Sequence, residues 1–257
     1  DAFSESDMRD WLVRIENYLK KTSNIQHPTS NGFYVDLKMD GLAIELIYEN
    51  GIFVQGSTRG DGIVGEDVTQ NIKTIEAIPL KLETRNSKLE TPKQLVIRGE
   101  TFLTKKEFAK INREQEKRGE KIYANPRNLA AGSIRQLDPA VTANRRLDSF
   151  AYALKTDFGQ RTHEEEHGLL KRLGFKTNPH NKFCKNLAEV QKFHDHWEKA
   201  REKLDYEIDG IVVQVNDNKM FQKLGVVGKA PRAVVAYKFS PKESTTKVKN
   251  IIISIGR

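Results

Sequence analysis

The sequence predicts an α+β fold, with hairpin-rich antiparallel sheets and helices packed on them. Two segments of alternating apolar and polar residues flank Glu49-Asn50-Gly51, and Asn-Gly is a strong signal for a two-residue β-hairpin. Other segments place apolar residues at helical spacing. The 257 residues fit one large domain or two modest ones.

Capping and turn residues predict where these elements begin and end. A helix with apolar residues from Met8 to Leu19 follows Ser4, a suitable N-cap. Thr104 and Glu107 form a capping box that opens another helix. The glycines of "RGDGIVGED" indicate a tight loop before a short helix. Further helices are expected after Thr162 and Asn186 and near Met220, and strands in "IFVQGST", "QLVIRGETFL", "DSFAYAL", "IDGIVVQV", "AVVAYKF" and "KVKNIIISI".

Composition narrows the class of protein. The net charge of +8 fits either a polyanionic partner or a basic soluble enzyme, and charge alone does not separate the two. The single cysteine, Cys184, excludes a disulfide framework or a multi-cysteine zinc module within these residues. No apolar run reaches the length of a membrane span, and we expect no charged-then-apolar leader ahead of Asp1. The expected setting is therefore reducing and cytoplasmic.

The stretch Tyr34–Gly51 carries charged residues through what otherwise reads as a buried strand. In an extended chain, Asp36, Lys38 and Asp40 share one face. If that face is solvent, the strand is ordinary, and a lone strand lysine is usually a surface group. If it is a cleft, an amine lies among carboxylates. A lysine is nucleophilic only when unprotonated, and burial or neighbouring cations such as Arg59 and Lys238 lower its pKa.

Three more positions repeat the pairing of a charged residue with small neighbours. Lys238 alternates with small or apolar residues on its strand, and Glu100 follows a glycine, which leaves room for a sugar or base. Asp209 precedes Gly210, and its carboxylate is suited to Mg²⁺, directly or through water. Taken singly, each of these residues also fits an exposed strand position.

In order along the chain, six segments resemble the adenylation domain of bacterial NAD⁺-dependent DNA ligase, over nearly the whole chain. They are "LKMDGLAIELIYENG", "GSTRGDGIVGEDVTQNIKTI", "RGE", "NPRNLAAGSIRQLDP", "YEIDGIVVQVN" and "KAPRAVVAYKF". The resemblance implies the ATP-grasp-like nucleotidyltransferase fold of the DNA ligase and mRNA-capping superfamily. It implies an adenylation domain over 1–244 and the start of an OB-fold over 245–257.

The resemblance also implies a reaction and its participants. Lys38 would attack the α-phosphorus of NAD⁺ and carry AMP to the 5′-phosphate of nicked double-stranded DNA, with Mg²⁺ and with the protein acting as a monomer. Asp40 and Asp209 would support Lys38 and the metal ion, with Lys238 in the catalytic set. The nucleotide would be held by Asp36, Arg59, Glu100, Gln214 and Lys238, and DNA phosphates by Arg127, Arg135 and Arg201, whose alternative role is that of solvated helix arginines.

Two positions depart from the family pattern. Asp36 stands where a glutamate reads the adenine amino group, and Gln214 stands where the family carries a lysine. Strict alternation also puts Asp209 and Gln214 on opposite strand faces. Either Gly210 distorts the strand, or one of the two residues lies outside the site.

Other interpretations compete with this one. An ATP-dependent ligase or mRNA-capping relative shares Lys-x-Asp-Gly, but "GSTRGDG" and "NPRNLAAGS" argue against it. A non-catalytic nucleic-acid-binding module is a third interpretation. The intact set of Lys38, Arg59, Glu100 and Lys238 argues against it. "HEEEH" at His163–His167 matches the zinc metalloprotease pattern but is set aside, because it opens a polar helix. The chain also lacks the family's N-terminal helical subdomain, so we expect the core of a longer enzyme that adenylylates itself very slowly.

Overall fold

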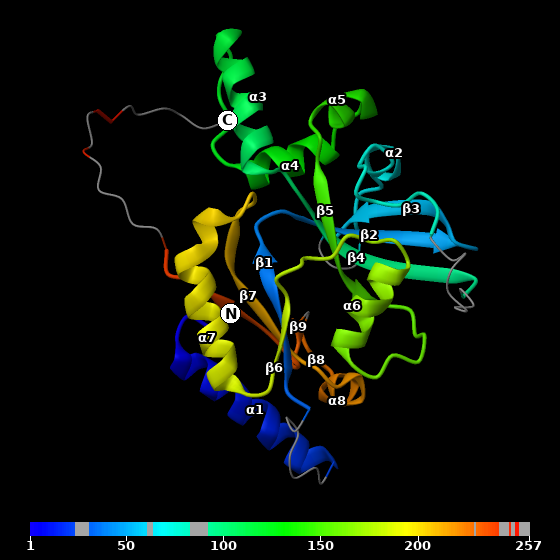
Figure 1. Ribbon diagram of the computed structural model, residues 1–257, viewed down its shortest axis with the longest axis vertical. Helices are drawn as coiled ribbons and strands as arrows, with labels where there is room; N and C mark the ends of the chain where they lie inside the picture. Colours follow the sequence, from blue (N-terminus) through cyan, green and yellow to red (C-terminus); the bar gives the residue numbers. More distant parts are fainter. Residues whose placement is uncertain are drawn as a thin grey trace.

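The computed structural model describes residues 1–23, 31–60, 64–82, 92–228, 230–241, 247 and 250–251. Within these residues, two four-stranded sheets are covered by helices (Figure 1). Every strand pairing in both sheets is antiparallel. The predicted α+β class with antiparallel sheets is therefore confirmed.

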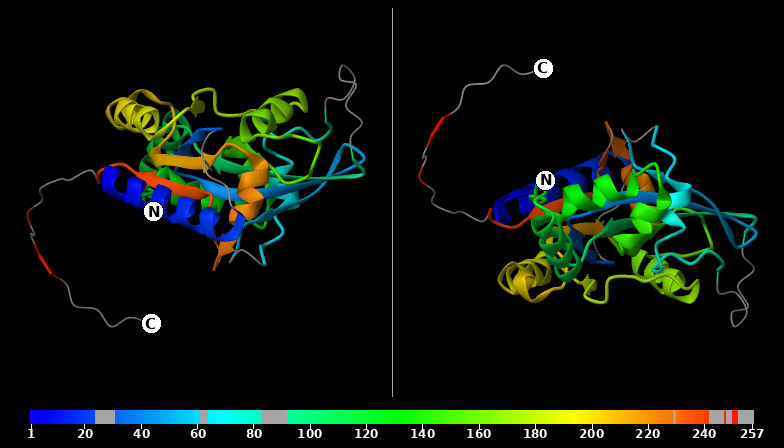
Figure 2. Two further views of the ribbon diagram at one scale, coloured as in Figure 1. Left: turned by 90° about the horizontal axis from the view of Figure 1, so that it is seen from below. Right: turned by 90° about the horizontal axis from the view of Figure 1, so that it is seen from above.

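The first sheet has the strand order β10-β7-β1-β6. Its strands are β1 (Phe33–Met39), β6 (Lys182–Cys184), β7 (Ile208–Val215) and β10 (Val234–Lys238). Two helices, α1 (Glu5–Ser23) and α7 (Leu187–Ala200), lie along it (Figure 2). Val35, Leu37 and Met39 point into the core that these helices close. The opposite face of β1 is left for Asp36 and Lys38.

The second sheet has the order β3-β2-β4-β5 and a core of its own. Its strands are β2 (Leu42–Glu49), β3 (Ile52–Thr58), β4 (Gln94–Phe102) and β5 (Asp148–Leu154). The helices around it are α2 (Thr69–Ile72), α3 (Lys105–Lys117), α4 (Pro126–Ile134), α5 (Pro139–Asn144) and α6 (His163–Arg172), which packs on β5. The remaining elements are a 3-10 turn (Arg201–Lys203), α8 (Asn218–Leu224), and the pair β8 (Val226–Val227) and β9 (Ala230–Pro231).

The hairpin and helix-cap signals in the sequence are confirmed. Asn50 and Gly51 both have positive φ angles, of 49° and 77°, as a two-residue hairpin requires. The side chains of Thr104, Thr162 and Asn186 each accept a backbone N–H of the helix that they precede. The predicted strand "KVKNIIISI" and the boundary at 244/245 lie largely outside the described residues.

One irregularity in β7 shapes the site. Lys38 pairs with Gly210, but the next residue of β1, Met39, pairs with Ile208, so Asp209 is an extra residue in the strand. A bulge of this kind changes the face on which a side chain lies. It places Asp209 on the same face as Lys38, where strict alternation would place it on the opposite face. Gly210 is required here, because a Cβ would collide with the carbonyl oxygen of Tyr237 on β10. Of the two alternatives for this strand, distortion at Gly210 is therefore the one that the structure adopts.

Candidate active site

Lys38 lies in a cluster of two amines and one carboxylate built from three neighbouring strands. Its Nζ is 3.0 Å from Asp209 Oδ1 and donates a hydrogen bond of 3.2 Å to Oδ2. Lys238 Nζ lies 2.5 Å from the same Oδ2. All three side chains are half-buried. Asp209 reaches both amines because the bulge turns it to their face of the sheet.

The electrostatics of this cluster favour an activated amine. Burial lowers the pKa of Lys38, and the positive charge of Lys238 acts in the same direction, while Asp209 opposes both. Burial alone would raise the pKa of Asp209, but its contacts with Lys238 and Lys38 hold it below its usual value. With both amines charged, the cluster carries one net positive charge, which suits a phosphate.

Glu100 joins this cluster from the second sheet. The chain passes from β1 to β2 through Asp40 and Gly41, and a side chain at Gly41 would collide with Glu100 and the backbone of β4. Burial raises the pKa of Glu100 to about 7, and the nearby charges of Lys38 and Arg127 act against that rise. Gly41 thus lets the two sheets approach closely enough that the charge of Lys38 acts on the carboxyl group of Glu100.

The structure distributes the other predicted site residues unevenly. Asp40 Oδ1 accepts a hydrogen bond of 2.9 Å from Arg127, not from Lys38. Arg59 is exposed at the end of β3, where its N–H donates to Ala43 on β2. Gln214 pairs with Tyr34, four positions along β1 from Lys38, so it shares the face of the site at the far end of the strand.

The predicted DNA-binding arginines are each engaged within the chain. Arg127 binds Asp40, and Arg135, which follows α4 as its C-cap, forms an ion pair with Glu66. Arg201 lies over the ring of Phe239 at 5.6 Å. Arg127 therefore connects the expected DNA surface to the loop that follows Lys38.

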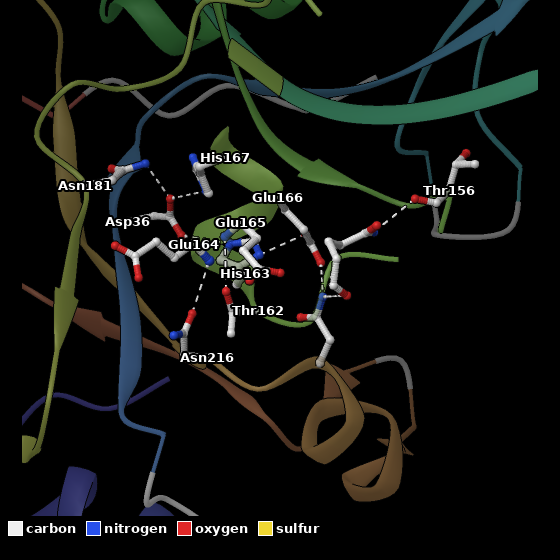
Figure 3. A network of polar contacts seen from close by, with 12 residues as sticks. Asp36, Thr156, Thr162, His163, Glu164, Glu165, Glu166, His167, Asn181 and Asn216 are labelled. Atoms are coloured by element: carbon white, nitrogen blue, oxygen red, sulfur yellow. Dashed lines mark hydrogen bonds and ion pairs between the residues drawn. The ribbon is translucent and has the colours of Figure 1, made fainter. Parts of the chain in front are cut away.

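Asp36 lies in a second cluster, with His163, His167 and Asn181 (Figure 3). His167 Nε2 lies 3.1 Å from its Oδ1 and His163 Nε2 lies 3.4 Å from its Oδ2, while Asn181 donates a 2.5 Å hydrogen bond to Oδ1. Burial alone would raise the pKa of Asp36, but the two imidazoles lower it. Burial alone would lower the pKa of His163, but Asp36 and Glu166 raise it to about 9.

Sequence reasoning missed this second cluster. His163, Glu166 and His167 are buried, so the helix that "HEEEH" opens is not the exposed polar helix that its residues suggest. The signal was present, since histidines four residues apart share one helix face. Its partner could not be found from the sequence, because Asp36 comes from a strand that lies 127 residues earlier.

Comparisons with known proteins identify the family of this chain. Residues 1–242 match the family described as the NAD-dependent DNA ligase adenylation domain. A DNA ligase of Bacillus cytotoxicus is 45% identical over 259 residues, and one of Bacillus thuringiensis is 44% identical over 260. All of this chain is covered in both matches, and it spans 37% of the length of those relatives. Within the described residues, no helix is long and apolar enough to cross a membrane. The chain belongs to the NAD-dependent DNA ligase adenylation domain family.

Proposed function

We propose that this chain forms a covalent lysyl-AMP from NAD⁺ at Lys38 and, within a DNA ligase, transfers AMP to the 5′-phosphate of a nick. The proposal depends above all on the cluster of Lys38, Asp209 and Lys238, in which burial and a second amine favour an unprotonated Lys38. Family membership supports NAD⁺ as the AMP donor. DNA joining in replication and repair, in the cytoplasm and as a monomer, completes the proposed role.

The chemistry of the first step follows from this cluster. The lone pair of Lys38 Nζ attacks the α-phosphorus of NAD⁺, and an N–P bond forms as the P–O bond to nicotinamide mononucleotide breaks. Nicotinamide mononucleotide leaves with the bonding electrons, and the amine gives up its remaining extra proton. Lys238 stays charged and offsets the negative charge that gathers on the phosphate oxygens. Asp209 contacts both amines and so holds them on the same side of the nucleotide.

The nucleotide would lie across the same face. Glu100 is suited to accept hydrogen bonds from the ribose hydroxyls when it is ionised, and Arg59 would contact phosphate from the end of β3. Asp36 and Gln214 are proposed at the base. A carboxylate offers about four lone-pair positions, and the hydrogen bond from Asn181 leaves Asp36 with acceptor positions for an amino group.

The binding of Mg²⁺ stays a prediction. The side chains of the chain do not form a Mg²⁺ site by themselves. The carboxylate of Asp209 lies within 3.2 Å of two amines, which repel a divalent cation. Mg²⁺ in proteins is commonly shared between one or two carboxylates and substrate phosphates. Asp209 would hold the ion together with nucleotide oxygens, where its charge would add to that of Lys238.

DNA would contact the surface around α4. Arg127 and Arg135 are proposed to bind DNA phosphates in exchange for Asp40 and Glu66, and Arg201 is proposed at a third phosphate. The exchange couples DNA to the active site, because release of Arg127 frees Asp40, two residues from Lys38.

A donor test separates this function from its alternatives. The chain is incubated for many hours with NAD⁺, with ATP or with neither, and its intact mass is measured. We expect one AMP adduct with NAD⁺ alone. An adduct from ATP alone would favour the ATP-dependent ligase or capping reaction. No adduct from either donor would contradict the proposed reaction and leave a nucleic-acid-binding module.

A further inference from the structure

The second cluster brings together side chains that bind metals. Asp36 on β1 and His163 and His167 on α6 place three potential ligand atoms within 4.8 Å of one another (Figure 3). Two imidazoles and a carboxylate form a common ligand set for Zn²⁺ and its neighbours in the first transition row. We propose that Asp36, His163 and His167 form a binding site for one divalent transition-metal ion of the Zn²⁺ type.

The distances fit such an ion. Bonds of about 2.0–2.2 Å in a tetrahedral site place neighbouring ligand atoms about 3.4 Å apart. The distances are 3.4 Å from Asp36 Oδ2 to His163 Nε2 and 3.1 Å from Asp36 Oδ1 to His167 Nε2. One ligand atom from each of the three residues lies within 4.8 Å of the other two, so a small shift would bring the three to corners of one tetrahedron.

His167 supplies an independent observation. Its ring is buried, and neither nitrogen makes a hydrogen bond in the part of the chain that the structure describes. Its Nε2 lies close to Asp36 Oδ1, but the contact lacks the geometry of a hydrogen bond. Buried polar atoms normally have partners. Two ligands of one metal ion lie close together without a hydrogen bond, because each directs a lone pair to the ion. The contact of His167 Nε2 with Asp36 Oδ1 fits this arrangement.

The surrounding contacts hold the ligands in place. Glu166 Oε2 lies 3.0 Å from His163 Nδ1 and, by accepting its proton, leaves Nε2 free to face Asp36. Glu166 is itself held by Asn218, whose side chain donates to Oε1 at 2.9 Å. The ring of Tyr34 packs on both imidazoles, with centroids 5.3 and 4.7 Å away. Carboxylate–histidine contacts of this kind orient the ligands of metal sites.

Charge and position indicate a structural ion rather than a hydrolytic one. The ion would offset two buried carboxylates, Asp36 and Glu166. Glu164, the glutamate that the metalloprotease pattern would use as a base, is exposed. The ion would join β1 of the first sheet to α6, which packs on the second sheet. None of this depends on the ligase reaction, because the ligands are all side chains of the chain itself.

The test measures retained metal. The chain is loaded with Zn²⁺, dialysed against metal-free buffer, and assayed for metal per chain by elemental analysis and native mass spectrometry. We expect one Zn²⁺ in the wild type, none in His167→Leu or Asp36→Asn, and none after loading with Mg²⁺. The control is His180→Gln/His196→Gln, which removes two exposed histidines beside Trp197 in a hollow between β6 and α7. This variant should retain one ion.

Each outcome decides the proposal. No retained Zn²⁺ in the wild type, or full retention in His167→Leu, would overturn it, as would loss of the ion only in the control. Far-UV circular dichroism of each metal-free variant shows whether it folds. If His167→Leu does not fold, His167→Gln takes its place in the metal assay. Zn²⁺ should also raise the Tm of the wild type by several degrees and leave that of His167→Gln unchanged, since an ion bound only by the folded state stabilises it.

Discussion

Two carboxylates on neighbouring strands, Asp209 and Asp36, each lie between two basic side chains, yet their surroundings differ. Asp209 binds two primary amines and keeps 31% of its side-chain surface exposed, whereas Asp36 meets two imidazoles and keeps 11%. An accessible cluster with surplus positive charge can receive a phosphate. A buried cluster rich in carboxylate and imidazole can hold a small cation. Burial and the kind of base, more than the shared arrangement, separate a proposed reaction site from a proposed metal site.

Replacement of each carboxylate should give the largest difference in the free energy of unfolding between the two clusters. Without metal, Asp36→Asn leaves imidazoles buried beside a neutral group and should lower the free energy of unfolding by about 3 kcal/mol. Asp209→Asn acts where water screens the charges and should cost less than about 1 kcal/mol. Urea unfolding of both variants in the presence of a chelator measures this. Equal losses would mean that burial does not distinguish the clusters.

The bulge that brings Asp209 to Lys38 gives the next largest effect. Gly210→Ala places a methyl group against the backbone of β10 and should destabilise the chain by about 1–3 kcal/mol. Gly132→Ala is the matched control, because a Cβ there meets open space in α4 and should stabilise by about 0.5–1 kcal/mol. Thermal or urea unfolding compares them. A neutral Gly210→Ala would show that the strand tolerates a side chain at this position.

The pH dependence of the free energy of unfolding should reveal the raised pKa of Glu100. Burial raises its pKa from 4.5 to about 7, so the folded chain retains a proton that the unfolded chain releases. Its contribution to stability is therefore complete below pH 4.5 and is lost as the pH rises to about 7. Glu100→Gln lacks this change. The stability of the wild type relative to the variant should fall across that interval in urea unfolding at several pH values, and a difference that rises or stays constant would contradict the assignment.

The smallest expected effect concerns DNA. Loss of two phosphate contacts in Arg127→Ala/Arg135→Ala should reduce the slope of log affinity against log salt by about 1.8. Arg9→Ala/Arg14→Ala removes the same charge from α1 and should leave the slope unchanged. Fluorescence anisotropy with nicked duplex DNA over a range of salt provides both slopes. Equal slopes in the two double variants would make Arg127 and Arg135 ordinary surface residues.

Much of the fold could be predicted from local sequence. The Asn50-Gly51 hairpin and the helix caps at Thr104, Thr162 and Asn186 depend on neighbouring residues only, and all are confirmed. The resemblance to the family likewise rests on short segments in order, and the family match confirms it.

The contacts between distant segments could not be predicted. Alternation placed Asp36, Lys38 and Asp40 on one face but did not show that each meets a different partner, because those partners come from other elements. The bulge at Asp209 was one of two open alternatives, since it depends on the register between three strands. The pattern "HEEEH" indicates only the start of a polar helix, because the sequence does not show which strand covers its histidines.

The identity of the adenylylated residue tests the central claim most directly. Lys105 is a suitable control, because its side chain is 29% exposed against 24% for Lys38 and also lies near carboxylates, those of Glu202 and Glu207. After incubation with NAD⁺, peptide mapping by mass spectrometry should place AMP on Lys38 in the wild type and in Lys105→Arg. Lys38→Arg should carry none. An adduct that persists in Lys38→Arg, or that maps to another lysine, would contradict the account.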